Sequence, residues 1–414
     1  MSADAPAGRR AIFSSPASTR PQAPGAGPGR ASTLAASSTG DLGVPGPDLP
    51  RRNRPGLDLP RRALLRGAAG WGLSALAAPA LAQGYGGLSD RAQGYAPVTP
   101  GRRFAFPRDH GAHPEFRIEW WYVTANLTAQ DGRPFGLQWT LFRQAISPDP
   151  AGAGWSTPQV WLAHAALTSA SAHVSAEKLG RAGVGQAGVA AQPFRAWIDD
   201  WRLQSREADF SPLRLFARGE GFLYDLDLTA RGPLVLQGQG GYSRKSEGGQ
   251  ASYYYSHPFL EAEGEIALEG ESQGRRIPVT GRAWLDREWS SQPLAEDQPG
   301  WDWFALHLPA GEKLMLYRMR RRGGPAYLSA VHISAAGDSR ALQGVAMRPV
   351  GLAPVAGREV PTNWAIEIPS LALSLTTAPL NPQSWMGGGF PYWEGPIRFE
   401  GTHPGVGYME LTGY

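Results

Sequence analysis

The chain has 414 residues, 42% of them hydrophobic and 18% charged, and it contains no cysteine. This length predicts two or three domains, and the lack of cysteine excludes disulfides, thiolate metal sites, iron–sulfur clusters and thiol nucleophiles. The formal net charge of the chain is +4, but the excess of positive charge lies at its N-terminal end. Residues 1–82 contain ten Arg and four Asp, whereas the remainder has 30 basic and 32 acidic residues. The remainder therefore lacks the excess of positive charge that nucleic-acid binding requires.

Residues 1–82 have the features of a leader. Residues 1–59 are mostly Pro, Ala, Gly, Ser and Arg, a composition that predicts a disordered extension. Arg61 and Arg62 then precede a mild apolar run over 67–76, and Ala80-Leu81-Ala82 is a small-x-small cleavage site. This order predicts a twin-arginine signal peptide over 60–82 and a mature protein that is exported folded, to the periplasm or beyond. The apolar run is too short to span a bilayer, so no transmembrane segment is expected in the mature chain.

From about Phe104 onward, the sequence consists of short segments in which apolar and polar residues alternate, separated by residues typical of turns. In the stretch 119–143, an arm over 122–127 and an arm over 135–142 flank Asp131-Gly132, which predicts a β-hairpin. Phe135, Leu137, Trp139 and Leu141 alternate along the second arm and should share one buried face. No stretch has sustained helical periodicity, so the pattern predicts an all-β protein built from barrels or sandwiches.

The hairpin has an internal counterpart. Residues 301–318 (WDWFALHLPAGEKLMLYR) resemble residues 119–143, because both begin with an acid beside Trp and end with an aromatic residue followed by Arg. The resemblance favours two related β-domains, joined near residues 290–300, where the sequence SQPLAEDQPG has the character of a linker.

Two histidine-containing segments are candidate binding sites. The stretch HGAHPEFRIEWWY carries His110, His113, Glu119 and Trp120, and its His-x-x-His spacing could contribute to a metal site only with a third ligand from elsewhere. The alternative is a loop whose His and Glu hydrogen-bond at the mouth of a barrel, and we predict no metal site. In the second segment, His257 stands before a proline and is thus held in an extended turn.

The stretch GRAWLDREWSSQ (281–292) is the strongest candidate for chemistry. If it is a strand, Trp284, Asp286 and Glu288 share one face, and Leu285, Arg287 and Trp289 share the other. Inside a barrel, the two carboxyl groups would lie in an aromatic cavity where desolvation and mutual repulsion raise a pKa and create a proton donor. The alternative is an exposed strand edge with a solvated acidic pair.

Four segments of the sequence together resemble a known family. FPRDHGAHPEFRIEWWYVTANL, SHPFLEAEGEI, GRAWLDREWSSQPL and GWDWFALHL are similar to motifs of the AttH-like/hydroxyneurosporene synthase (CrtC) superfamily, which includes carotenoid 1,2-hydratases and predicted secreted hydrolases. The resemblance implies an exported protein with two lipocalin-like antiparallel β-barrel domains, over 104–294 and 295–414. The family's Asp-His-x-Trp motif falls on residues 286–289, with Arg287 in place of the histidine. Arg cannot donate a proton near neutral pH, which leaves Asp286 or Glu288 as the acid.

The resemblance also implies a function and a set of site residues. We expect an apolar isoprenoid or lipid-like small-molecule ligand and acid-catalysed hydration or hydrolysis without a cofactor. The alternative is a non-catalytic ligand-binding accessory of an ABC export system of the lipoprotein-release type. The predicted catalytic residues are Asp286, Glu288, Trp289 and Asp302. The predicted ligand-binding residues are His110, His113, Glu119, Trp120, His257, Trp284, Arg287, Trp303 and Tyr317.

Overall fold

The computed structural model describes residue 88 and residues 92–149 and 151–414, so the predicted extension and signal peptide lie outside the described residues. In the described part the chain forms strands, three short 3-10 turns and no α-helix; the turns are η2 (Arg108–His110), η3 (Gly154–Ser156) and η4 (Pro369–Leu371). No helix within these residues is long and apolar enough to cross a membrane. The all-β prediction is therefore confirmed, and the two antiparallel sheets curl into a barrel and a half-barrel.

The first sheet contains 13 strands in the order β4-β3-β2-β1-β13-β12-β9-β8-β7-β6-β5, with β10 and β11 paired to β12. Its strands are β1 (Ile118–Ala129), β2 (Pro134–Ala145), β3 (Gln159–Thr168), β4 (His173–Arg181), β5 (Ala187–Ala191), β6 (Phe194–Ile198), β7 (Trp201–Ser205), β8 (Leu213–Gly219), β9 (Phe222–Ala230), β10 (Val235–Leu236), β11 (Tyr242–Arg244), β12 (Ala251–Leu268) and β13 (Ile277–Ser290).

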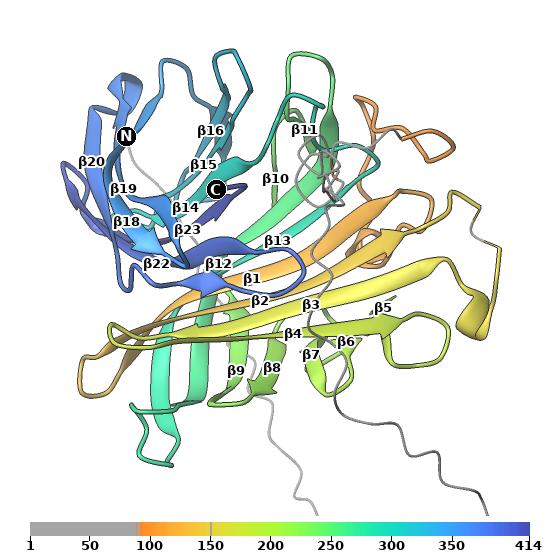
Figure 1. Ribbon diagram of the computed structural model, residues 1–414, viewed down its shortest axis with the longest axis horizontal. Helices are drawn as coiled ribbons and strands as arrows, with labels where there is room; N and C mark the ends of the chain where they lie inside the picture. The colour runs from red at the N-terminus through yellow and green to blue at the C-terminus, as the bar shows by residue number, and fades with distance from the viewer. Residues whose placement is uncertain (1–87, 89–91, 150) are drawn as a thin grey trace, which may run out of the picture. The chain divides into compact units, whose positions relative to one another are not determined.

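The second sheet contains ten strands in the order β17-β16-β15-β14-β23-β22-β20-β19-β18, with β21 paired to β22. Its strands are β14 (Trp301–His307), β15 (Lys313–Met319), β16 (Tyr327–Ile333), β17 (Ser339–Ala341), β18 (Ala346–Val355), β19 (Arg358–Ile368), β20 (Leu373–Pro379), β21 (Trp385–Met386), β22 (Tyr392–Gly401) and β23 (Gly405–Thr412). The chain passes from one sheet to the other between Ser290 and Trp301. In Figure 1 the second sheet, drawn in teal to blue, lies against β1 and β2, and contacts join β1 to β23 and β2 to β22.

Side-chain alternation gives β2 a core face. Phe135, Leu137, Trp139 and Leu141 of β2 are all buried in the core of the first sheet, as the sequence predicts. The turn before β2 also forms as predicted, since Gly132 adopts a φ of 85° that favours glycine. The second sheet has a separate core that includes Phe304, Leu316 and Trp364.

The two sheets begin with equivalent hairpins. In β1–β2, Glu119 pairs with Arg143 and Trp120 with Phe142. In β14–β15, Asp302 pairs with Arg318 and Trp303 with Tyr317, in the same relative register. Each acid forms an ion pair with the arginine opposite it. In both sheets the first strand also pairs with the last, so the internal resemblance in sequence corresponds to a repeated arrangement of strands.

A third core lies between the sheets. It contains Ile118, Tyr122 and Trp284 from the first sheet and Met315 and Tyr317 from the second. The first-sheet members belong to the faces of β1 and β13 that point away from that sheet's own core, since strand residues alternate between faces. From Ala283 to Ser290 both faces of β13 are therefore buried, one within the first sheet and the other against the second.

Candidate active site

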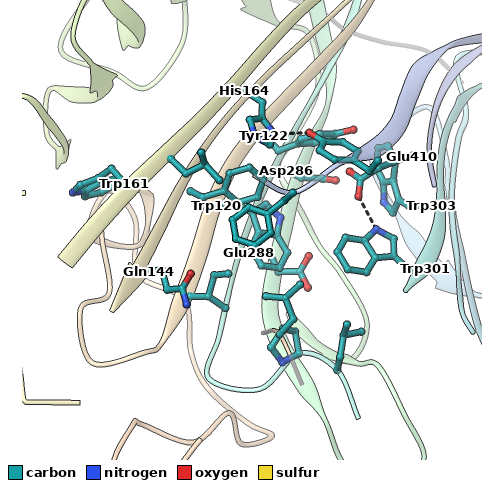
Figure 2. Close-up of a pocket in the computed structure, with 18 of the residues that line it drawn as sticks. Trp120, Tyr122, Gln144, Trp161, His164, Asp286, Glu288, Trp301, Trp303 and Glu410 are labelled. Carbon is teal, nitrogen blue, oxygen red and sulfur yellow. Dashed lines mark hydrogen bonds between the residues drawn. The ribbon is translucent and has the colours of Figure 1, made fainter. Parts of the chain in front are cut away.

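A cavity of about 630 Å³ lies at this junction and is lined by residues of both sheets. Its size is that of a small-molecule site. Its walls are largely aromatic, with contributions from Trp120, Tyr122, Phe142, Trp161, Tyr254, Trp301, Trp303, Tyr317, Phe390 and Tyr392. Three carboxyl groups, those of Asp286, Glu288 and Glu410, also line it (Figure 2). An apolar space that contains a few acids favours an apolar ligand on which a proton is transferred.

Asp286 is a nearly buried acid in this wall, with 3% of its surface exposed. Its carboxylate accepts hydrogen bonds from Tyr254 Oη (2.6 Å), Ser256 Oγ (2.5 Å) and Trp284 Nε1 (2.6 Å). Burial raises the pKa of Asp286 to about 7, aided by the charge of Glu288 and opposed by the three hydrogen bonds. Near neutral pH this group can therefore exist in either protonation state, as acid–base catalysis requires.

Glu288 shares this face of β13 but has a different environment. Lys245 Nζ lies 2.7 Å from Glu288 Oε1, and Ser252 donates a hydrogen bond to the same oxygen. Burial opposes the charge of Lys245, but the adjacent Glu288 holds the lysine pKa above its ordinary value. The ammonium group also lies over the rings of Tyr254 and Tyr317, 4.8 and 4.4 Å from their centroids. Glu288 and Lys245 thus form a buried ion pair in the cavity wall.

Glu410 on β23 is a carboxyl group that the sequence reasoning missed. It is half-buried, lines the cavity and accepts a hydrogen bond of 2.7 Å from Trp301 Nε1 (dashed in Figure 2). Burial raises the pKa of Glu410 to about 8, together with the negative charges of Glu288 and Asp286. Behind it, burial and the neighbouring Glu410 raise the pKa of Glu394, which accepts a hydrogen bond from Tyr122. The internal repeat could have revealed Glu410, had the comparison been extended to the last strand of each sheet.

His164 on β3 is a second lining residue that was missed. Its Nδ1 lies 3.0 Å from Tyr392 Oη, and its Nε2 lies 3.1 Å from Glu177 Oε2. Burial lowers the pKa of His164, although Glu177 acts in the opposite direction. The surrounding sequence, QVWLAHAALT, offers no signal beyond a histidine on an otherwise apolar strand.

The other face of β13 carries the predicted residues Arg287 and Trp289, which do not line the cavity. Arg287 is fully buried, forms an ion pair with Glu119, and lies over the rings of Trp121 and Trp289, 3.8 and 4.8 Å from their centroids. Burial would raise the pKa of Glu119, but the guanidinium groups of Arg143 and Arg287 hold it well below its ordinary value. This cluster belongs to the core of the first sheet.

The predicted histidines lie near this cluster and also do not line the cavity. His113 stacks on Trp289 with ring centroids 4.0 Å apart and contacts Glu119 and Asp109. His110 stacks on Phe210 at 3.8 Å, and its Nδ1 lies 2.7 Å from Tyr255 Oη. Burial lowers the pKa of His110 to about 3 and that of His257 to about 4, so both rings are neutral at pH 7. Within the described residues, no group of three or more His, Asp or Glu is arranged to hold a metal ion.

The remaining predicted residues divide into two groups. Trp120, Trp303 and Tyr317 line the cavity. Trp284 lies behind the wall and donates a hydrogen bond to the cavity-lining Asp286. Asp302 instead points into an ion cluster with Arg318 (2.8 Å), Arg320 (2.6 Å) and the hydroxyl of Tyr414. It is the counterpart of Glu119 in the second sheet, and both positions are structural in this geometry.

The alternation predicted for 281–292 is confirmed, but its surroundings differ from the expectation. Asp286 and Glu288 are buried, so the stretch is not a solvated edge. The carboxyl groups do not point into the interior of a barrel either, because the core of the first sheet contains Leu285 and Trp289 from the opposite face. They point out of the first sheet toward the second, since the other half of the cavity is formed by β14, β15, β22 and β23.

Fold and site together describe a lipocalin-like protein of two antiparallel sheets with an acid-lined apolar cavity, and comparison with known proteins gives its family. The sequence model of the AttH-like family matches residues 97–414. A crystal structure of a protein from Nitrosomonas europaea assigned to AttH is 37% identical, covers 77% of this chain and 99% of its own, and has a TM-score of 0.69. The chain therefore belongs to the AttH-like family, as its motifs suggested.

A second solved structure is more distant. Kievitone hydratase from Nectria haematococca is 16% identical, covers 77% of this chain and 96% of its own, and has a TM-score of 0.58, which shows a shared fold. No curated protein matches the chain.

Proposed function

We propose that this protein binds an apolar small molecule, of isoprenoid or lipid-like character, in the cavity between the sheets and catalyses its hydration or hydrolysis without a cofactor. The observation that carries the proposal is the carboxyl group of Asp286, which lines an aromatic cavity and has its pKa raised to about 7. A hydratase fold in a distant relative supports the same class of reaction.

The reaction makes three demands on the site. It needs a group that transfers protons near neutral pH, a wall that tolerates a developing cation, and room for water. Asp286 answers the first demand. Trp120 and Trp303 present aromatic rings to the cavity, and such rings attract positive charge to their faces. The charge of Glu288 is balanced by Lys245, and this ion pair positions the cavity wall around Asp286.

The proposed location is outside the cytoplasm, reached by twin-arginine export. This part of the proposal rests on residues 60–82 of the sequence, which lie outside the described residues. Export in the folded state suits a β-protein in which strands distant in sequence must pair, as β1 and β13 do here.

The test is to purify the wild-type protein and the Asp286→Asn variant from the native periplasm and to extract what they bind. We expect both proteins to yield the same class of apolar molecule. After incubation in H₂¹⁸O, only the wild type should yield labelled product: one molecule heavier by a labelled water for hydration, or two fragments of which one carries ¹⁸O for hydrolysis. The exposed Glu261→Gln variant is the matched control and should behave as the wild type.

Two results would contradict the proposal in different ways. An empty cavity in both proteins would contradict ligand binding. The same unaltered molecule from both, with no label, would contradict catalysis and favour the accessory protein of an ABC exporter.

A further inference from the structure

The repeated architecture gives Glu288 a counterpart in the second sheet. In the first sheet, Trp120 of β1 pairs with Glu288 of the last strand. In the second sheet, Trp303 of β14 pairs with Glu410 of the last strand, and Trp120 and Trp303 are equivalent within the two hairpins. All four side chains line the one cavity, so each sheet contributes a Trp–Glu pair to it.

The two equivalent glutamates differ in what neutralises them. Glu288 has the ammonium group of Lys245 at 2.7 Å. Glu410 forms no ion pair with any described residue, and its contact is the single hydrogen bond from Trp301. Its neighbour across the strands is another acid, Glu394, at the position that Tyr254 occupies beside Glu288. A carboxylate without a cation, next to a second carboxyl group in an aromatic cavity, is stabilised by holding a proton.

We propose that Glu410 is the proton donor of this site and that Asp286 is the base that works with it. The inference rests on the function proposed above and assigns the two proton transfers of that reaction to two groups.

The hydrogen bonds determine which acid takes which role. Asp286 accepts three hydrogen bonds, from Tyr254, Ser256 and Trp284, all of which stabilise its carboxylate. Glu410 accepts one, and negative charge at Asp286 and Glu288 favours its neutral form. The pKa values follow this order, about 7 for Asp286 and about 8 for Glu410. The three donors around Asp286 therefore favour its ionised form, which suits a base, and the absence of a cation beside Glu410 favours its protonated form, which suits a donor.

Together, Glu410 and Asp286 can add water to a carbon–carbon double bond. Glu410 gives its proton to one alkene carbon, whose new C–H bond uses the π electrons and leaves a cation on the other carbon. Water attacks this cation through oxygen, and its released proton passes to the carboxylate of Asp286. The product is an alcohol. Return of the proton from Asp286 to Glu410, by exchange with solvent, restores the starting state with no oxidant or cofactor consumed.

The first test locates the proton without any substrate. Infrared titration of the protonated carboxyl band should show, in the wild-type protein, a component that disappears as the pH rises through about 8. This component should be absent from Glu410→Gln and present in the Glu261→Gln control. A band that Glu410→Gln leaves unchanged would overturn the assignment, because Glu410 would then be ionised already.

The second test uses geranylgeraniol in H₂¹⁸O as the probe reaction. The pH profile of the wild type should be bell-shaped, rising through about 7 as Asp286 ionises and falling through about 8 as Glu410 loses its proton. Glu410→Gln should lower turnover about 100-fold or more and remove the fall at high pH. Asp286→Asn should remove the rise at low pH.

The results of this experiment distinguish the donor role of Glu410 from the proposed function itself. Wild-type turnover that survives Glu410→Gln with its high-pH fall intact would overturn this inference and leave the proposed function standing. Absence of turnover by the wild type on this probe and on the molecule extracted from the protein would overturn the proposed function, and the donor role with it.

Discussion

At the scale of single residues, Asp286 shows how a buried acid couples folding to pH. Its pKa is about 7 in the folded protein, against an ordinary value of 3.8. An unfolded chain therefore loses this proton near pH 4, whereas the folded protein keeps it until about pH 7. The contribution of Asp286 to stability is thus greatest below pH 4 and declines as the pH rises from 4 to 7.

This coupling predicts the pH dependence of the Asp286→Asn variant. Asn has no proton to lose, so between pH 4 and pH 8 the free energy of unfolding of the variant should rise relative to that of the wild type by about 4 kcal/mol. Urea denaturation at the two pH values measures the change. A difference between variant and wild type that is the same at both pH values would contradict the raised pKa.

Arg287 illustrates a different role for a buried charge, since it pairs with Glu119 in the core of the first sheet. Arg287→Met would leave a buried carboxylate with one fewer partner and should cost about 3–5 kcal/mol of folding free energy. The double variant Arg287→Met/Glu119→Gln should recover part of the loss. Equal stability of Arg287→Met and wild type in urea would show that the pair is not structural. Because Arg287 faces away from the cavity, Arg287→His should not increase turnover in the proposed hydration reaction.

At the scale of elements, β13 pairs with β1 in the first sheet and provides Asp286 and Glu288 to the cavity wall, and its backbone lies very close to β1. A Cβ placed on Gly281 would lie 2.0 Å from the carbonyl oxygen of Asn126, so β13 could not keep its register with a side chain there. Gly281→Ala should lower the free energy of unfolding by about 1–3 kcal/mol. Gly387→Ala is the matched control, because no atom lies within 4 Å of its added Cβ. A loss no larger than the control's in chemical denaturation would refute the close approach.

Much of the arrangement of individual strands and turns was predictable from the sequence. Alternation identified the faces of the β2 hairpin arm and of 281–292, and Asp131-Gly132 marked the turn, because these are local properties of the strand. The sequence could not predict what each face of a strand packs against. Two-residue periodicity places Asp286 and Arg287 on opposite sides, but both sides of this half of β13 are buried. Only the position of the second sheet makes one of them a cavity wall.

At the scale of the whole molecule, the site exists only because two sheets meet. Glu410 and His164 lie far apart in the sequence, on strands β23 and β3, and no local pattern connects them. The repeat of the acid–Trp hairpin was the one signal of this arrangement. The face formed by Ile118, Tyr122 and Trp284 should be exposed if the second sheet is removed.

This arrangement predicts the behaviour of a truncated chain that ends at residue 294. The exposed apolar face should bind the dye 1-anilinonaphthalene-8-sulfonate strongly and promote self-association, whereas the full-length protein should do neither. Dye fluorescence and sedimentation measure the two effects. A monomeric fragment that leaves the dye unbound would contradict the shared core between the sheets.

The most direct test of the proposed site is a crystal structure of the Asp286→Asn variant purified from its native host, in which the bound molecule should accumulate unreacted. We expect electron density for an apolar molecule between Trp120 and Trp303, with a carbon of its reacting bond facing Glu410 and a water beside the amide introduced at position 286. Density inside the core of the first sheet, or a cavity filled only by water, would contradict it.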